Sequence, residues 1–180
     1  MKRYYIDMDG VIVKYDRDGY IGENPRWLRS NGHYFRDLPP DRRMLAFVDK
    51  LVEICRYTGD ELFVLTSLPA KGPIFNEQFH DKIVWLNKWL PSIDIDHILI
   101  SVTTKRDAAE LINDCVLTKD DILIDDYNKN LIDWEKANGT SVKYCNGINN
   151  PDSFDGKKLQ IASSITEALE SIGVDTSYLT

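Results

Sequence analysis

The chain has 180 residues, of which 43% are hydrophobic and 28% are charged, a composition typical of one globular domain with a buried core. Its net charge of −7 argues against a surface that binds a nucleic-acid polymer, because such surfaces carry a basic patch. No apolar run approaches the roughly 20 residues of a membrane span, and no basic-then-apolar leader precedes the first predicted strand. The three cysteines show no metal-binding spacing, so we expect reduced thiols in a cytoplasmic protein without membrane association.

The first predicted strand runs directly into two acidic residues. Residues 4–6 are aromatic or β-branched, which indicates a short buried strand. Asp7, Met8, Asp9 and Gly10 follow it. In an open α/β sheet the functional crevice lies beyond the carboxyl ends of the strands, so we expect Asp7 and Asp9 to stand in that crevice and Met8 to point away from it.

Two carboxylates this close favour a hard cation such as Mg²⁺ between them, because like charges repel. One carboxylate can then attack phosphorus, while the other moves a proton to and from the leaving oxygen. The alternative is an ordinary turn, since Asp and Gly are common turn residues. We interpret the similar letters at 16–19 as such a turn, because no apolar strand precedes them. An EF-hand loop starting at Asp7 is excluded, since its glycine and glutamate are missing.

Residues 14–40 show no sustained periodicity, apart from a short helix suggested at 25–30. A connection of this length often forms a lid or a binding loop, so we predict a small cap inserted here. Its rings could stack on a flat ligand beside the basic side chains, or they could form a small core under the cap. The aromatic residues are Tyr15, Tyr20, Trp27, Tyr34 and Phe35, and the neighbouring basic ones are Arg26, Arg29, His33 and Arg36.

A helix and a second strand follow the cap. Apolar residues recur at helical spacing over 41–57, which predicts a helix with one face on a sheet. Residues 61–65 form the next predicted strand, and Thr66 and Ser67 come at its carboxyl end. A hydroxyl there, with free backbone N–H groups behind it, could bind a phosphate oxygen or merely cap the next turn.

Two lysines then compete for the role of phosphate ligand. Lys82 lies near the start of a helix predicted for 77–90, whose buried face we expect to hold Phe79, Ile83, Leu86 and Leu90. Lys105 opens a helix predicted to run through 113, directly after a strand at 97–102. A lysine near a helix N-terminus opposes the helix dipole, so each of the two needs an anion or exposure to solvent.

A second acidic pair, Asp125 and Asp126, ends the strand predicted for 121–124. If this strand lies beside the first one, both pairs meet at one point and could hold Mg²⁺. Helices at 128–138 and 163–172, a strand at 141–144 and a loop at 147–156 complete the chain. We therefore predict one α/β domain over 1–180, a Rossmann-like three-layer sandwich with a mostly parallel central sheet and a reduced cap at 14–40.

In this order the motifs resemble the haloacid dehalogenase-like (HAD) phosphohydrolase superfamily, and more closely its 5′(3′)-deoxyribonucleotidases of the cytosolic type C group. The resemblance covers roughly residues 3–145. The matching segments are D-M-D-G-V at 7–11, F-R-D-L-P-P at 35–40, T-S at 66–67, D-K-I-V-W-L at 81–86 and L-I-D-D at 123–126.

The resemblance implies Mg²⁺-dependent hydrolysis of a (deoxy)ribonucleoside monophosphate through an aspartyl-phosphate. In this scheme Asp7 is the nucleophile, and Asp9 is the acid that protonates the leaving oxygen and then the base that activates water. Thr66 and Lys82 bind the phosphate, with Ser67 and Lys105 as further candidates. The metal is held by Asp7, the backbone carbonyl of Asp9, and Asp125 or Asp126.

Two departures from the family pattern leave alternatives open. The segment between the first two motifs is shorter than in the animal enzymes, so the substrate could instead be another small phosphomonoester, such as a sugar phosphate. More residues separate Lys82 from Asp125 than the family pattern leads us to expect, so Lys82 and Lys105 both stay candidates for the phosphate-binding lysine. A non-catalytic HAD-fold binding protein is a third interpretation, although a pure binder needs no acid/base partner such as Asp9. We expect a small-molecule phosphomonoester as partner, and a homodimer stays open.

Overall fold

A six-stranded parallel sheet forms the centre of the protein in the computed structural model, which describes residues 1–14, 33–68, 75–113, 116–149, 151–162 and 164–179. The strand order is β3-β2-β1-β4-β5-β6, and every pairing is parallel. The strands are β1 (Arg3–Ile6), β2 (Glu61–Ser67), β3 (Ile98–Ser101), β4 (Asp121–Asp125), β5 (Thr140–Tyr144) and β6 (Lys157–Leu159).

Strand β1 lies between β2 and β4, and this placement brings the predicted motifs together. Ile6 is in register with Val64 on one side and with Ile124 on the other. The backbone N–H of Asp7 donates to the carbonyl of Ile124 at 2.9 Å, which carries the pairing one residue further. Because the strands are parallel, the residues that follow β1, β2 and β4 emerge at the same edge of the sheet.

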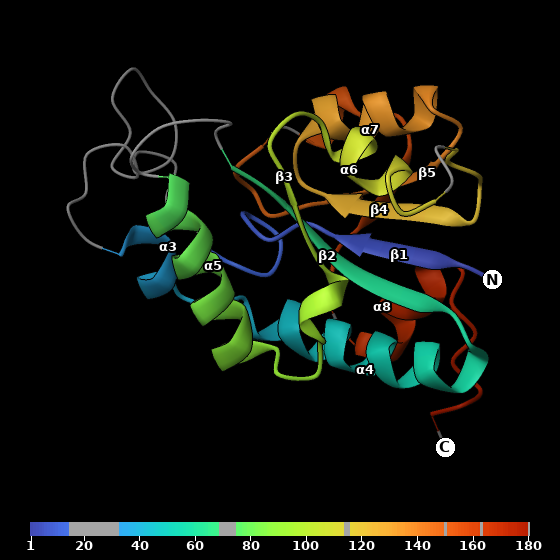
Figure 1. Cartoon of the computed structure of the whole chain (residues 1–180). Helices are drawn as coiled ribbons and strands as arrows, with labels where there is room; N and C mark the ends of the chain where they lie inside the picture. Colours follow the sequence, from blue (N-terminus) through green and yellow to red (C-terminus); the bar gives the residue numbers. More distant parts are fainter. Residues whose placement is uncertain (15–32, 69–74, 114–115, 150, 163, 180) are drawn as a thin grey trace.

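Helices cover both faces of the sheet, so the architecture is a three-layer α/β sandwich (Figure 1). Alternate side chains of β1 enter different cores, as a strand's period of two requires: Tyr4 and Ile6 face α4 and α8, whereas Tyr5 faces α6 and α7. The α3 and α5 helices lie beside one another, beyond the carboxyl ends of β1 and β4. The helices are α3 (Tyr34–Asp37), α4 (Arg42–Thr58), α5 (Phe75–Trp89), α6 (Lys105–Glu110), α7 (Asn128–Lys136) and α8 (Ile165–Ser171), with single 3₁₀ turns at Ile95–His97 and Pro151–Ser153.

A tight coil follows β1 and returns the chain to α4. The backbone N–H groups of Val11, Ile12 and Val13 all donate to the Met8 carbonyl. Gly10 has φ of 84°, a left-handed conformation that glycine adopts without steric cost. Met8 itself is fully buried in the core, as predicted, so the coil is anchored on one side while its acidic residues face the other.

The predicted fold class is confirmed, with three differences in detail. All strand pairings among the described residues are parallel, and the sheet has a sixth strand, β6, between the predicted loop at 147–156 and the predicted helix at 163–172, where no element was predicted. The buried face of α5 is only partly as predicted: Leu86 and Leu90 are buried, but Phe79 is 43% exposed. The polar residues Gln78, Asp81 and Lys82 are buried instead. Hydrophobicity placed that face incorrectly because polar side chains of α5 point inward.

Most of the predicted cap lies outside the described residues, since these exclude 15–32. The helix suggested at 25–30 and the ring–ligand contacts of Tyr15, Tyr20 and Trp27 therefore stay predictions. The returning end of the segment is described: α3 packs on α5, and the indole N–H of Trp85 donates to the Leu38 carbonyl at 2.8 Å.

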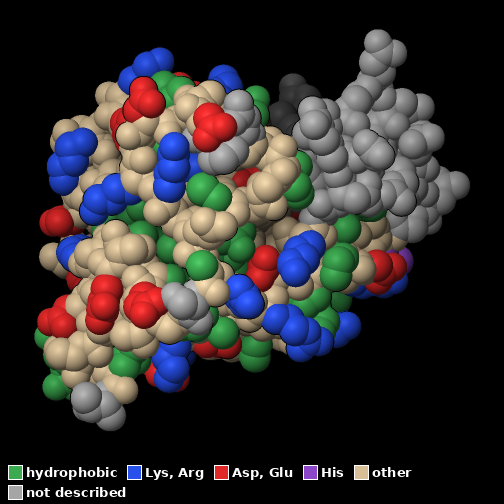
Figure 2. All heavy atoms as spheres, turned by 180° about the vertical axis from the view of Figure 1, so that it is seen from behind, with side chains coloured by type: hydrophobic (Ala, Val, Ile, Leu, Met, Phe, Trp, Pro, Cys, Tyr) green, Lys and Arg blue, Asp and Glu red, His purple; other side chains and the backbone are tan. Residues whose placement is uncertain are grey.

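Charged side chains of both signs are intermingled over the surface seen from behind, with hydrophobic side chains in small groups between them (Figure 2). In the described part of the chain, none of the helices combines the length and the apolar character that crossing a membrane would require.

Candidate active site

Asp7 and Asp9 lie where predicted, just beyond the carboxyl end of β1, and each is only 6% exposed. The backbone N–H of Met8 donates to Asp7 Oδ1 at 2.7 Å, and the Lys105 ammonium contacts the same oxygen at 2.5 Å. Among the described residues, both of these partners of the Asp7 carboxylate therefore hold Oδ1. The other oxygen, Oδ2, is the one left for a ligand.

Lys105 links the first acidic pair to the second. Its buried ammonium lies 2.5 Å from Asp7 Oδ1 and 2.7 Å from Asp125 Oδ2. It is the first residue of α6, and Asp125 is the last of β4. A lysine at the start of a helix needs a compensating anion, and for Lys105 the carboxylates of Asp7 and Asp125 provide it. Asn130, one turn into α7, also donates to Asp125 Oδ2, at 2.9 Å.

Lys82 makes a second set of contacts in the same site, with Asp9 and Thr66. Its ammonium contacts Asp9 Oδ2, the Thr66 hydroxyl at 2.7 Å and the Ser67 carbonyl at 3.1 Å. The Phe35 ring lies over the same ammonium, 4.5 Å from ring centroid to nitrogen, which is a favourable cation–π distance. The side chain of Lys82 is completely buried, which overturns the alternative that it is exposed.

The structure therefore places the two lysines on different acids, instead of offering them for one role. Lys105 contacts Asp7 and Asp125, whereas Lys82 contacts Asp9. Thr66 is fully buried within the cluster, while Ser67 contributes its carbonyl and has an exposed side chain.

Asp126 is held by residues that the sequence did not single out. Its Oδ2 accepts hydrogen bonds from the side-chain amides of Asn146 and Asn149, both at 2.6 Å. Its backbone carbonyl accepts from the buried ammonium of Lys143 on β5. Asn146 and Asn149 follow a strand in a stretch rich in turn residues, where composition predicts only a loop.

The electrostatics of this cluster favour a cation. Burial raises the pKa of Asp7 well above its usual range; Lys105 opposes this rise, and the charges of Asp125, Asp9 and Asp126 add to it. Burial, reinforced by Asp125, also raises the pKa of Asp126 to about 6. Four carboxylates thus meet the ammonium groups of Lys82, Lys105 and Lys143, so acidic groups outnumber basic ones in the cluster.

The residues fit a magnesium ion by their chemistry and their placement. Asp7, Asp125 and Asp126 are all buried, and each offers a carboxylate oxygen within 4.8 Å of the others. Mg²⁺ prefers oxygen ligands of this kind and commonly takes only a few from the protein. A cation would also offset the excess of acidic groups just described. Which of Asp125 and Asp126 binds more closely was left open by the sequence, and both are placed to do so.

A second group of potential ligands lies where α3 meets α5. His33, Glu77 and Asp81 offer ligand atoms within 4.8 Å of one another. Here His33 Nδ1 and Asp81 Oδ1 already form a hydrogen bond of 2.8 Å, and the His33 side chain is 43% exposed. This pairing accounts for the buried Asp81 carboxylate without a metal ion.

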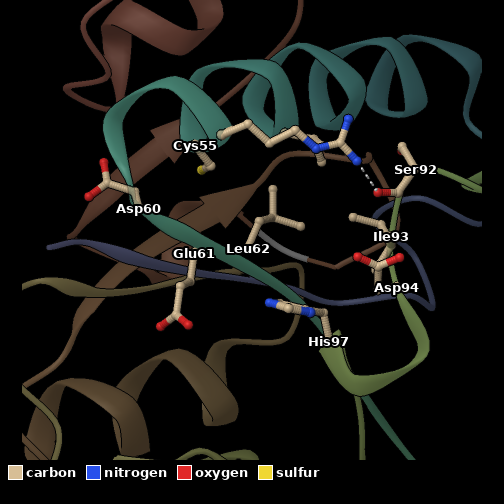
Figure 3. Close-up of a pocket in the computed structure, with 10 residues that line it drawn as sticks. Cys55, Asp60, Glu61, Leu62, Ser92, Ile93, Asp94 and His97 are labelled. Carbon is tan, nitrogen blue, oxygen red and sulfur yellow. Dashed lines mark hydrogen bonds between the residues drawn. The ribbon is translucent and has the colours of Figure 1, made fainter.

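Two cavities among the described residues lie at opposite ends of the sheet, and one of these two touches the candidate site. A small cavity of about 50 Å³ reaches Ser67, Lys105 and Asn130. Another, of about 150 Å³, is lined by Cys55, Asp60, Glu61, Ser92 and His97, and in it Arg56 donates to the Ser92 carbonyl at 3.0 Å (Figure 3). Since Glu61 begins β2, this second cavity lies at the amino ends of the strands, away from the acidic residues.

Comparison with known proteins gives a fold match. No protein-family model matches the chain, and no curated protein matches it. Among solved structures, D,D-heptose 1,7-bisphosphate phosphatase from B. bronchiseptica, complexed with magnesium and phosphate, superimposes with a TM-score of 0.59 at 12% identity, over 96% of this chain and 98% of that one. The two chains share a fold.

A structural-genomics target matches less well, with a TM-score of 0.45 at 15% identity, over 78% of this chain and 40% of the other. At these identities the likeness concerns the fold. Since one fold hosts many functions, the chemistry of this chain has to be argued from its own residues.

Proposed function

We propose that the chain is a Mg²⁺-dependent phosphomonoesterase of the HAD type, which works through an aspartyl-phosphate. One observation carries the proposal: acidic residues from the ends of β1 and β4, a threonine from the end of β2 and two buried lysines converge at one point. Phosphoryl transfer needs positioned charges more than unusual side chains, and this convergence supplies them.

In the first half of the reaction, Asp7 Oδ2 attacks phosphorus, and the bond from phosphorus to the leaving oxygen breaks. Asp9 gives its proton to that oxygen. Asp9 Oδ1 is buried, and no hydrogen-bond partner for it occurs in the described part of the chain, so it is free to meet the leaving group. Met8 N–H and Lys105 hold the other oxygen of Asp7 and orient the nucleophile.

In the second half, a water molecule attacks phosphorus through its oxygen, and Asp9 takes a proton from that water molecule. The bond between phosphorus and Asp7 breaks, inorganic phosphate leaves, and Asp7 is regenerated as a carboxylate. Asp9 therefore acts first as an acid and then as a base, which is why it has to stand beside Asp7 without being the nucleophile.

Charge on the phosphate is neutralised by groups already in place. Lys82, the Thr66 hydroxyl and Lys105 are the groups that would meet it. Because Lys82 already contacts Asp9, an entering phosphate competes with Asp9 for this ammonium group. A magnesium ion, held by Asp7, Asp125, Asp126 and the Asp9 carbonyl, would supply further neutralisation of the transferred group.

We further propose a nucleoside monophosphate, preferably a deoxy one, as the substrate. Support comes from the resemblance of residues 81–86 and 123–126 to the deoxyribonucleotidases, and from the aromatic residues of the proposed cap at 14–40. A sugar phosphate is the alternative within the same chemistry, because a shorter cap selects its substrate less closely.

A panel of purified monophosphates tests both levels of the proposal. Phosphate release is measured with Mg²⁺ and with EDTA from 5′- and 3′-deoxynucleotides, ribonucleotides and sugar phosphates. Metal-dependent release from deoxynucleotides is the expected result. Release from sugar phosphates alone would keep the phosphatase and discard the nucleotidase, and no release from any compound would favour a non-catalytic binding protein.

A further inference from the structure

Asn146 connects the two loops that carry the candidate metal ligands. Its side-chain nitrogen Nδ2 donates to Asp126 Oδ2 at 2.6 Å and to the Gly10 carbonyl at 2.9 Å. Gly10 directly follows Asp9, and Asp126 directly follows Asp125. One amide thus joins the loop after β1 to the loop after β4, although Asn146 itself comes from the end of β5.

The orientation of this amide is fixed from its other end. Asn146 Oδ1 accepts hydrogen bonds from the backbone N–H groups of Ile148 at 2.8 Å and of Asn149 at 3.4 Å. Since a backbone N–H only donates, the oxygen must face these two groups and the nitrogen must face Asp126 and Gly10. The side chain is therefore held at both ends, between its own turn and the acidic loop.

A neutral amide has an advantage over a lysine in this position. Lys105 neutralises Asp7 and Asp125, and a further cation on Asp126 would compete directly with a metal ion. The Asn146 N–H group orients the Asp126 carboxylate by a hydrogen bond while leaving its negative charge available for a cation. Lys143 of β5 donates to the backbone carbonyl of Asp126 and to Asn128 Oδ1, so it fixes the loop, whereas the Asn146 amide bonds to the carboxylate itself.

We propose that Asn146 is a positioning residue of the metal site, and that it sets the affinity for Mg²⁺ by holding Asp126 against the loop that follows Asp9. This inference rests on the proposed function, because it assumes that the acidic cluster binds Mg²⁺. Partners of metal ligands commonly change metal affinity by about 10–100-fold when they are replaced.

The competing explanation is that Asn146 only stabilises its own turn. Asn146→Ser separates the two roles, because a serine hydroxyl can accept from a backbone N–H two residues on but is too short to reach both Asp126 and Gly10. Asn149→Ser removes a second donor to Asp126 Oδ2. Asn87→Ser, at an exposed position of α5, is the control.

The decisive measurement is calorimetric titration of Mg²⁺ into the metal-free wild type and the three variants, without substrate. We expect N146S to bind Mg²⁺ about 10–100-fold more weakly than wild type, Asn149→Ser to lose less, and Asn87→Ser to be unchanged. The Mg²⁺ concentration for half-maximal phosphate release should rise by the same factor in N146S, while the rate at saturating Mg²⁺ approaches that of wild type.

The outcomes separate this inference from the proposed function. Equal affinity in folded N146S and wild type would overturn the positioning role and leave the phosphatase intact. Absence of Mg²⁺ binding by the wild type would overturn the metal site and the inference together. Circular dichroism checks folding, and if N146S is unfolded, Asn146→Thr, which offers the same hydroxyl acceptor, is measured against the same expectation.

Discussion

At the scale of single residues, the two acids after β1 are distinguished by what holds them. Asp7 is bound by a backbone N–H and by Lys105, which suit a nucleophile that must keep one orientation. Asp9 contacts Lys82 through one oxygen and keeps the other without a described partner. The neighbouring residues therefore support the assignment of roles that the resemblance implies, and substitution of each acid tests it.

Asp9→Asn keeps the shape of the side chain but cannot transfer the proton. We expect turnover of a phosphomonoester to fall by about 10²–10⁴-fold or more, the usual contribution of a general acid–base group. Steady-state phosphate release measures the loss. An unchanged rate would remove Asp9 from the mechanism.

Asp7→Asn is the matched variant of the other acid. It should prevent formation of an aluminium- or beryllium-fluoride adduct at the site, and normal adduct formation would contradict the role of Asp7 as nucleophile.

The sequence predicted the residues of this site better than it predicted their partners. Asp7, Asp9, Asp125 and Asp126 each end an apolar strand, and that position made them recognisable. Which lysine meets which acid depends on side-chain placement across elements, so it could not be obtained from spacing. Asn146 could not be recognised from the sequence, because an asparagine in a loop is common and its bond to the Gly10 carbonyl joins distant parts of the chain.

At the scale of secondary structure, the strands were predicted well where burial makes them apolar. β1, β2 and β4 each contain a run of consecutive buried apolar residues, at 4–6, 62–65 and 122–124, as central strands of parallel sheets do. β6 has three residues, of which Lys157 and Lys158 are exposed, so it has no hydrophobic pattern to detect. The error on α5 has the opposite origin: Asp81 and Lys82 are buried because they serve polar contacts, which hydrophobic periodicity cannot reveal.

The amino end of β4 carries a buried ion pair that stabilises the sheet at the end away from the candidate site. Asp121 is fully buried and receives hydrogen bonds from Arg3 at 2.7 Å, Asn113 at 2.9 Å and both the backbone N–H and the hydroxyl of Thr118, at 2.7 and 2.9 Å. The network therefore ties β1 and the segment around Asn113 and Thr118 to the start of β4.

Asp121→Asn should destabilise the protein by about 2–4 kcal/mol, because breaking a buried charge pair leaves Arg3 uncompensated and sets an amide N–H against other donors. Urea unfolding followed by circular dichroism gives the free energy of unfolding. Asp120→Asn changes the exposed neighbour and should have little effect. Equal stability of the Asp121 variant and wild type would show that the network contributes little. The activity per folded molecule should stay the same in both variants.

At the scale of the whole molecule, the candidate site concentrates negative charge inside a protein that already carries a net charge of −7. Without a metal ion this excess opposes folding, since burial and Asp125 raise the pKa of Asp126. The fold tolerates the excess because Lys82, Lys105 and Lys143 are buried among the carboxylates, and a cation would offset what remains. Stability and function are therefore coupled through one set of charges.

This coupling predicts how stability depends on pH and on Mg²⁺. The pKa of Asp126 is raised from 3.8 to about 6 in the folded state, so between these values the folded protein binds more protons than the unfolded chain does. The free energy of unfolding of metal-free protein should consequently contain a contribution that falls as pH rises from about 4 to about 6, by at most about 3 kcal/mol. Mg²⁺ at pH 7 should reverse the loss, because a ligand of the folded state stabilises it.

Asp126→Asn isolates the contribution of Asp126 to the free energy of unfolding, because it removes the buried charge and the proposed metal ligand together. Thermal and urea unfolding of both proteins are compared at pH 4 and pH 7, with EDTA and with Mg²⁺. With EDTA the variant should be the more stable protein at pH 7, and its advantage should disappear near pH 4, where Asp126 of the wild type is protonated. With Mg²⁺ only the wild type should gain stability. A wild type whose stability is insensitive to Mg²⁺ at pH 7 would show that the excess charge is compensated from within the chain, and the acidic cluster would then lose its assignment as a metal site.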